Sequence, residues 1–266
     1  MNYVFLDISY IIFYRYNALL TWWNMAHPDD PLGDPYKNEI FVEKFKKLFV
    51  EKIKEIPKKL KINPKNVCFI GARDCNRAQI WRHDYCDNYK GNRVHDDTFM
   101  GGPFFWLVYN STLLQEAGCE IMLYNDKLEA DDCIALASIY LNKKSPESEQ
   151  WLITNDMDYL QLARENVHIF NLKYTELNKK KTSSDDPQKD LFCKIVLGDK
   201  SDNIPGIFKK CGPKLAYRCY DEPEFFEIML KQQPEARTKF YFNKRLIDFT
   251  EIPDELVVDF VSTIPF

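Results

Sequence analysis

The chain has 266 residues, 45% of them hydrophobic and 15% aromatic, which is enough to bury the core of one large domain or two small ones. Its most apolar stretch, Tyr10 to Trp23, contains Arg15 and Asn17 and is too short to span a bilayer, so no membrane association is expected. The formal net charge of -4 argues against a polyanionic partner. This argument fails if the acids bind divalent cations, because the lysine clusters can then attract a polyanion.

The sequence also indicates the compartment and excludes one type of metal site. No basic region followed by an apolar core precedes the first strand-like run, so secretion is not expected. The eight cysteines include no Cys-x-x-Cys pair, which is typical of reduced thiols in a cytoplasmic or nuclear protein. The four histidines are scattered as well, so a zinc site is not predicted. A nucleoid, a viral replication site and a nucleus stay open as locations, depending on the host.

Five short apolar runs are predicted to be strands, at residues 3–6, 67–70, 120–124, 151–154 and 167–170. Between them, residues 10–23 are typical of a buried helix, and residues 38–60 have helical spacing with lysines on the opposite face. A further helix is expected to begin with the acidic stretch Leu128 to Asp132. Strands that alternate with helices need crossover connections, so the pattern predicts an α/β fold around a mostly parallel central sheet.

Acidic side chains follow the first four predicted strands, where each run ends. In chain order they are Asp7, Asp74, Glu129, Asp131, Asp132, Asp156 and Asp158. Because the carboxyl ends of parallel strands meet at one edge of the sheet, these side chains are expected to converge. Like charges raise one another's pKa, so we expect divalent cations between them. Ligands that are all oxygen favour Mg²⁺, with Mn²⁺ as the alternative, and two such ions can activate water against a phosphodiester. Unrelated helix caps are the structural alternative, but they do not require the same order four times.

The segment between the second and third strands is expected to cover this edge. Residues 77–93 combine cations with aromatic rings, a mixture that suits a phosphate backbone and exposed base faces. Gly101-Gly102-Pro103 interrupts the chain before a second helix-like run at 104–117. Two helices around a glycine-rich break predict a mobile arch at about residues 77–117.

The most specific motif lies in the C-terminal third of the chain. It reads Gly-Asp-x-Ser-Asp-Asn-Ile-Pro-Gly at 198–206 and Gly-Pro-Lys-x-Ala at 212–216. Glycine turns of this kind let backbone N–H groups approach phosphates. The motif resembles the helix-three-turn-helix signature of the 5'-nuclease superfamily, which includes flap endonucleases and bacterial and phage 5'-3' exonucleases.

The resemblance covers nearly the whole chain and implies its organisation. A PIN-like catalytic core with the arch is expected at 1–186, and a C-terminal helical DNA-binding subdomain at 187–266, with its helix-three-turn-helix at about 190–218. It also implies a monomer and two metal positions. The first would use Asp74, Glu129, Asp131 and Asp156, supported by Asp7. The second would use Asp158, Asp199 and Asp202, with Asp132 beside the cluster. Some members hold K⁺ in the glycine turn, so that ion is a candidate there.

A second stretch of the resemblance concerns the nucleic acid. Tyr89-Lys90-Gly91-Asn92-Arg93 resembles the family's Tyr-Lys-x-Asn-Arg segment. It implies that Lys90 contacts the scissile phosphate, that Tyr89 stacks on the terminal base, and that Arg82 and Arg93 contact phosphates. As catalytic residues we expect Lys90, Asp7 and Asp156. The remaining expected nucleic-acid contacts are Gly206, Lys209, Lys210, Gly212 and Lys214.

The predicted function is a magnesium-dependent, structure-specific 5'-nuclease that hydrolyses DNA at 5' ends, flaps or junctions, as an exonuclease and flap endonuclease in replication or repair. A ribonuclease of the same fold stays open, since the sequence does not separate the two sugars. A DNA-junction binding protein without activity is the non-enzyme alternative. A haloacid-dehalogenase-type phosphatase is disfavoured because it needs a second aspartate where Ser9 stands.

Overall fold

A computed structural model of the chain describes residues 1–93, 96, 98–180 and 183–266. Its centre is a five-stranded sheet in the order β3-β2-β1-β4-β5, and all four neighbouring pairs are parallel. The strands are β1 (Asn2–Asp7), β2 (Val67–Ala72), β3 (Cys119–Leu123), β4 (Glu149–Ile153) and β5 (Val167–Phe170). The five predicted strands and the α/β fold are therefore confirmed.

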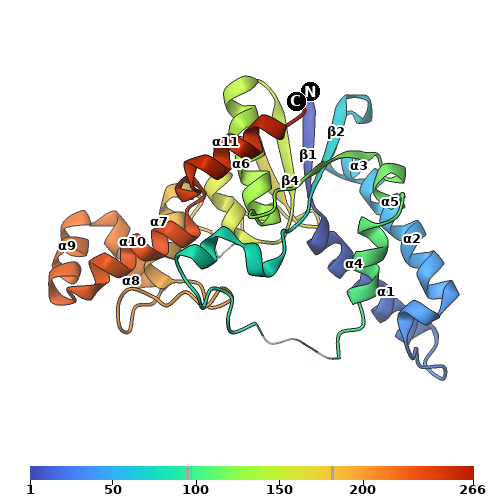
Figure 1. Cartoon of the computed structure of the whole chain (residues 1–266), viewed down its shortest axis with the longest axis horizontal. Helices are drawn as coiled ribbons and strands as arrows, with labels where there is room; N and C mark the ends of the chain where they lie inside the picture. The colour runs from blue at the N-terminus through green and yellow to red at the C-terminus, as the bar shows by residue number, and fades with distance from the viewer. Residues whose placement is uncertain (94–95, 97, 181–182) are drawn as a thin grey trace.

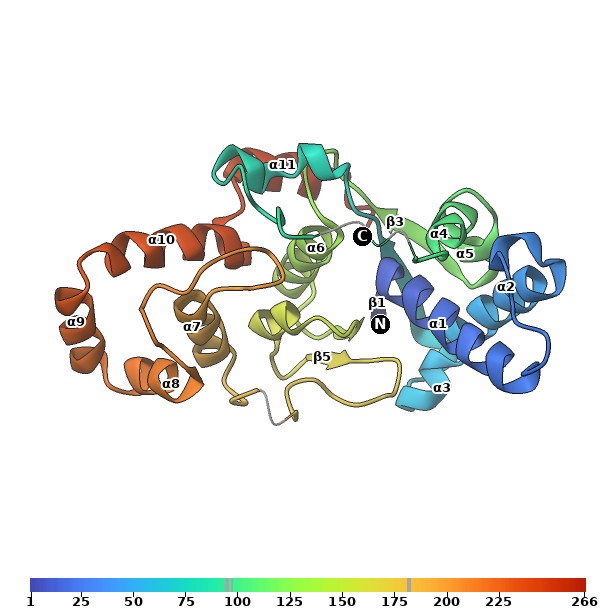
Figure 2. The same ribbon diagram turned by 90° about the horizontal axis from the view of Figure 1, so that it is seen from below.

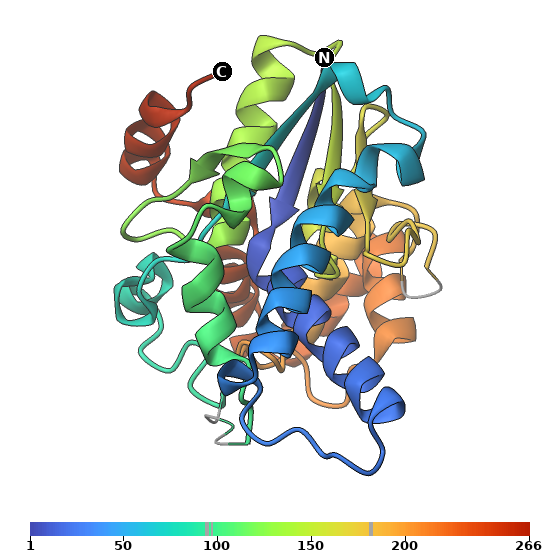
Figure 3. The same ribbon diagram turned by 90° about the vertical axis from the view of Figure 1, so that its right-hand side faces the viewer.

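Alternating side chains of the central strand β1 divide the core into two layers. Val4 and Leu6 belong to one cluster of buried residues and Phe5 to the other, and all three are fully buried. The first layer carries α1 (Ile8–Ala26), α2 (Glu39–Lys54), α3 (Ile56–Leu60), α4 (Gly102–Tyr109) and α5 (Leu113–Glu116). The second carries α6 (Ala130–Lys144) and α11 (Asp254–Thr263). Figure 3 shows α1 and α2 on one side of the strands and α6 and α11 on the other.

The remaining helices form a separate group beside the sheet. They are α7 (Pro187–Leu197), α8 (Pro213–Asp221), α9 (Pro223–Gln232) and α10 (Glu235–Ile247). They share a core of their own around Val196, Phe208 and Ala216. Figures 1 and 2 place this group at one end of the molecule and α1 to α5 at the other. The last helix, α11, returns to pack on α6, so the helical group ends with α10 rather than with the chain.

Two predicted helices differ from the structure. The single helix expected at 38–60 is divided at Glu55, because Pro57 lacks the N–H that would continue α2 and instead sits in the first turn of α3. The first arch helix is not formed: the chain makes only the 3-10 turns Arg77–Gln79 and Trp81–Asp84.

The first arch segment lacks a helix because distant partners hold it. The Trp81 N–H donates to the Lys127 carbonyl, and Arg82 Nε donates to the Leu246 carbonyl, so tertiary contacts replace the helical pattern. The second arch run, expected at 104–117, is present as α4 and α5. Residues 94, 95 and 97 of the predicted arch lie outside the described residues. Among the helices that the structure describes, none combines the length and the apolar character that crossing a bilayer requires.

Candidate active site

The predicted acids meet at the carboxyl-terminal edge of the sheet. Asp7 ends β1 and caps α1: one carboxylate oxygen accepts a hydrogen bond from Tyr10 N at 3.0 Å and the other from Thr154 Oγ1 at 2.8 Å. Asp74 follows β2 and accepts hydrogen bonds from Ser9 Oγ at 3.1 Å and from Ala130 N at 2.9 Å. These bonds join the ends of β1, β2 and β4 to the starts of α1 and α6, so the local geometry of the edge is held from both layers.

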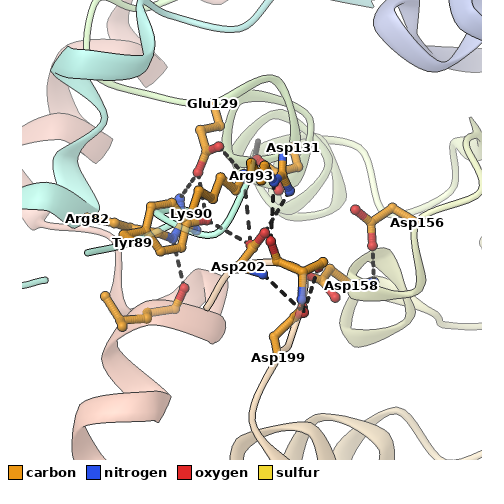
Figure 4. Close-up of polar contacts among 12 residues, drawn as sticks. Arg82, Tyr89, Lys90, Arg93, Glu129, Asp131, Asp156, Asp158, Asp199 and Asp202 are labelled. Atoms are coloured by element: carbon orange, nitrogen blue, oxygen red, sulfur yellow. Dashed lines mark hydrogen bonds and ion pairs between the residues drawn. The ribbon is translucent and has the colours of Figure 1, made fainter. Parts of the chain in front are cut away.

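Two further acid groups complete this edge. Glu129 caps α6, and Asp131 and Asp132 lie in its first turn; one ligand atom from each of the three lies within 4.8 Å of the others. Asp156 follows β4 and accepts a hydrogen bond from Asp158 N at 2.9 Å. Figure 4 shows Asp158, Asp199 and Asp202 gathered opposite Glu129 and Asp131.

Four acids of this cluster make no ion pair with the side chains that the structure describes. Burial, with smaller contributions from Asp74 and Asp156, raises the pKa of Asp7 to about 6. Burial, Asp132 and Glu129 raise the pKa of Asp131 well above its ordinary value. None of Asp7, Asp74, Asp131 and Asp156 forms an ion pair with a residue that the structure describes. These four carboxylates therefore have the electrostatic character of cation ligands.

The other acids are balanced by side chains of the chain itself. Arg82 pairs with Asp132. Arg82 and Lys90 both pair with Glu129 (Figure 4). Although burial opposes ionisation, Lys90 and Arg82 keep the pKa of Glu129 below its ordinary value. Cations of the chain thus lie beside Glu129 and Asp132, in addition to the divalent ions that the sequence led us to expect between the acids.

A lysine that the sequence analysis did not single out balances two more acids. Lys194, on α7, pairs with Asp158 and lies 2.8 Å from Asp199. Although burial favours the neutral acid, Lys194 and Ser201 hold the pKa of Asp199 at about 2. Lys194 lies in the last turn of a helix, five residues before the first aspartate of the glycine-turn motif. This position is the signal that could have identified it from the sequence.

The residues expected to contact nucleic acid are not all exposed. Arg82 is only 2% exposed, and all three of its guanidinium nitrogens donate hydrogen bonds, to Asp132, Glu129 and the Leu246 carbonyl. The structure thus places Arg82 inside the fold as a support for the acids, away from the surface position that a phosphate contact needs. Arg93 differs, since half of its side chain is exposed while it pairs with Asp202 at 2.7 Å.

Tyr89 and Lys90 are likewise drawn into the cluster. Tyr89 is 3% exposed, and its hydroxyl lies 3.0 Å from Glu129 and 2.9 Å from Asp202, so its ring does not present the open face expected for stacking. Burial opposes the charge on Lys90, but Glu129, Asp131 and Asp202 raise its pKa, so it stays protonated. The structure thus places this lysine in the centre of the acid cluster.

Residues 88–90 of the arch segment are hydrogen-bonded to the glycine turn, residues 198–212. The Lys90 N–H donates to the Asp202 carbonyl at 2.9 Å, and Asn203 Nδ2 donates to the Asn88 carbonyl at 2.9 Å. Lys90 and Asn203 both adopt positive φ, of 55° and 61°, which lets the two turns approach each other. Residues far apart in sequence are thereby brought to one place, and the turn's aspartates face the acids of the sheet edge.

The glycine turn has the form that the motif predicts. α7 and α8 are joined by residues 198–212. Gly198 has φ of 73°, and a Cβ on it would lie 2.3 Å from the Ile204 carbonyl oxygen; a Cβ on Gly206 would lie 2.9 Å from that of Leu197. Gly212 caps α8. The side chains of Lys209, Lys210 and Lys214 are exposed around this turn and have no ion-pair partner among the described residues.

Comparisons with known proteins agree with this arrangement. A family profile described as "5'-3' exonuclease, N-terminal resolvase-like domain" matches residues 3–189. The 5'-3' exonuclease of Bacillus subtilis (strain 168) is 30% identical over 166 residues, which are 58% of this chain and 52% of that protein. That of Mycoplasmopsis pulmonis (strain UAB CTIP) is 32% identical over 171 residues, 60% of this chain and 52% of that protein. The chain thus spans about half the length of these relatives.

Solved structures show the same fold. The T5 D15 protein co-crystallised with metal ions has a TM-score of 0.68 and 16% identity, covering 98% of this chain and 97% of that one. The bacteriophage T5 D15 flap endonuclease in a complex with DNA and metal ions has a TM-score of 0.66 and 17% identity, with the same coverage. The profile match covers most of the chain, and the sheet edge carries the acids that the resemblance implied. The chain belongs to the 5'-3' exonuclease family.

Proposed function

We propose that the protein is a magnesium-dependent, structure-specific 5'-nuclease that hydrolyses DNA phosphodiester bonds, as an exonuclease and flap endonuclease in replication or repair. The observation that carries the proposal is the meeting of Asp7, Asp74, Asp131 and Asp156 at the sheet edge without an ion-pair partner among the described residues. Crowded carboxylates with raised pKa values are suited to binding hard cations.

The donor set fits Mg²⁺, or Mn²⁺, because it consists of carboxylate oxygens alone. Asp74, Glu129, Asp131 and Asp156, supported by Asp7, would hold the first ion, and Asp158, Asp199 and Asp202 the second. When bound, the two ions would supply an activated water and stabilise the leaving oxygen of the phosphodiester. Asp132 belongs to the same cluster, but both of its carboxylate oxygens accept hydrogen bonds from Arg82, which favours a supporting role.

The chain's own cations have a separate task in this proposal. Lys90 stays protonated and lies beside the acids, so its charge would be available to offset that of a scissile phosphate bound to the metal ions. Arg93 is half exposed next to Asp202 and can contact a neighbouring phosphate. Tyr89 could stack on a terminal base only after leaving its present contacts.

The glycine turn would bind the double-stranded part of the DNA, next to the acid cluster where the phosphodiester bond is cleaved. Gly212 is exposed with open space around it, Gly206 packs against the Leu197 carbonyl and shapes the turn, and Lys209, Lys210 and Lys214 supply positive charge without a described ion-pair partner. K⁺ in this turn, action as a monomer and a cytoplasmic location are parts of the same proposal.

The proposal is tested with a 5'-flap DNA duplex labelled at either end, incubated with Mg²⁺ or with EDTA. We expect cleavage only with Mg²⁺, and product sizes separate trimming from the 5' end from a cut at the junction. A matched RNA flap in competition separates the two sugars. Tight binding without cleavage in either Mg²⁺ or Mn²⁺ would contradict the nuclease and favour a junction-binding protein.

A further inference from the structure

A hollow of about 450 Å³ lies beside the acid cluster and is used by none of the functions assigned above. It is formed at the β3 side of the sheet edge, where the ends of β2 and β3 meet α4 and α5. Its walls carry Arg73, Tyr109, Ser111, Gln115, Met122 and Tyr124. Ligand pockets for small molecules have volumes of roughly 300–1,000 Å³, so the hollow has room for one nucleotide unit.

One wall of the hollow presents an arginine whose charge is not used within the described part of the fold. Arg73 is exposed, and its guanidinium lies over the ring of Tyr109, 4.9 Å from the ring centroid. It forms no ion pair with a described residue, unlike Arg82 and Arg93. A guanidinium stacked on a ring keeps its N–H edge free, and that edge matches the geometry of a phosphate.

The hollow and the acid cluster are joined by hydrogen bonds. The Tyr109 hydroxyl lies 3.1 Å from Ser9 Oγ, and Ser9 Oγ donates to Asp74 at 3.1 Å. Arg73 also directly precedes Asp74 in the chain, and the Arg73 N–H is fixed to the Leu123 carbonyl at 3.1 Å. A phosphate on Arg73 would therefore lie close to the carboxylates.

The chemistry of the other walls selects a nucleotide rather than a bare anion. Tyr124 is 46% exposed, so its ring offers aromatic surface against which a base can stack, whereas the ring of Tyr109 supports the Arg73 guanidinium. Gln115 and Ser111 add amide and hydroxyl groups that can bind base or sugar. Such a mixture of one cation, aromatic rings and neutral polar groups fits a ligand with a phosphate, a sugar and a flat base.

We propose that this hollow binds a nucleoside 5'-monophosphate unit, with Arg73 on the phosphate and Tyr124 beside the base. The inference rests on the proposed nuclease function and extends it. Two sources share this chemistry: the 5'-terminal nucleotide of an uncut strand, and the mononucleotide that an exonuclease releases. In either case the site would favour strands that begin with a 5'-phosphate.

The experiment measures binding in EDTA, so that neither cleavage nor a metal-bound phosphate contributes. Isothermal titration compares 2'-deoxyadenosine 5'-monophosphate with 2'-deoxyadenosine, and fluorescence anisotropy compares one duplex with a 5'-phosphate or a 5'-hydroxyl. The variants are R73A, R73K and, as a matched exposed arginine, R237A. Thermal melting in the same buffer checks that each variant is folded.

We expect the wild type to prefer the phosphorylated form in at least one comparison, and R73A to weaken that binding about tenfold, as for loss of a charge-assisted pair. R73K should restore part of the loss and R237A should change nothing. A preference for the free nucleotide identifies the product as the ligand, and one for the duplex alone identifies the strand end. The inference is overturned if neither comparison shows a preference, or if R73A and R237A behave alike. Both readouts work without cleavage, so an inactive protein would fail the nuclease proposal and not this one.

Discussion

The guanidinium of Arg82 and the carboxylate of Asp132 form a double hydrogen bond inside the protein, with distances of 2.8 and 2.7 Å. Asp132 is fully buried and also accepts hydrogen bonds from Trp81 Nε1 and from the Glu129 N–H. Arg82, from the arch segment, thus neutralises a buried carboxylate in the first turn of α6, the helix whose start carries the central acids. The position of those acids depends on this buried pair.

Removal of Arg82 should destabilise the whole fold. Arg82→Ala leaves a buried carboxylate unpaired, and breaking a buried ion pair in this way costs about 3–5 kcal/mol. Arg93→Ala is the matched control, because its side chain is half exposed and such pairs contribute less than about 1 kcal/mol. Urea unfolding of both variants in EDTA measures the difference, and equal small losses would show that the buried pair is not structural.

The stability of the metal-free protein should fall with rising pH through Asp7. Its pKa is raised from 3.8 to about 6, so the folded state holds a proton that the unfolded state has released between these values. Stability contributed by this group is therefore present below about pH 4 and lost as the pH rises to about 6.

The variant Asp7→Asn isolates this effect, since asparagine caps a helix as well as aspartate does. In EDTA, the melting temperature of the wild type relative to Asp7→Asn should decrease from pH 4 to pH 6. A difference that stays constant over this range would contradict the raised pKa.

The exposed lysines of the glycine turn should supply part of the salt-dependent affinity for DNA. Replacing Lys209, Lys210 and Lys214 with alanine removes up to three phosphate contacts, which lowers the slope of log K against log salt by up to about 3. Replacing Lys58, Lys59 and Lys65, which are also exposed, provides a control of equal charge. If both triple variants change the slope equally, the turn has no special part in binding.

The sheet and the positions of its acids could be read from the sequence because both signals are local. Each strand is a short apolar run, and the acids follow within a few residues of its end, where a parallel sheet must bring them together. The acidic helix start at Leu128 to Asp132 is local as well, and the glycine turn was expected because its short motif resembles that of a known family.

The orientation of the cations could not be read in this way, because their partners are distant. Arg82 bonds to the Leu246 carbonyl across 164 positions, and Lys194 reaches Asp158 across 36 positions of the chain. A stretch rich in cations and rings fits a nucleic-acid surface and a buried ion-pair network equally well. Only the folded arrangement shows that Arg82 is inside while Arg93 stays half exposed.

The central claim is that the carboxylates at the sheet edge, four of which have no ion-pair partner among the described residues, hold the metal ions for DNA cleavage, and Asp131→Asn tests it most directly. Cleavage of a labelled 5'-flap duplex in Mg²⁺ and binding of the same duplex in EDTA are measured side by side, with the first-turn acid variant Asp254→Asn as the control. We predict that Asp131→Asn lowers cleavage by more than about 100-fold, beyond the range for residues that only support a metal ligand, while binding survives. Asp156→Asn should behave in the same way. Cleavage by Asp131→Asn near the wild-type rate in Mg²⁺ would contradict the site.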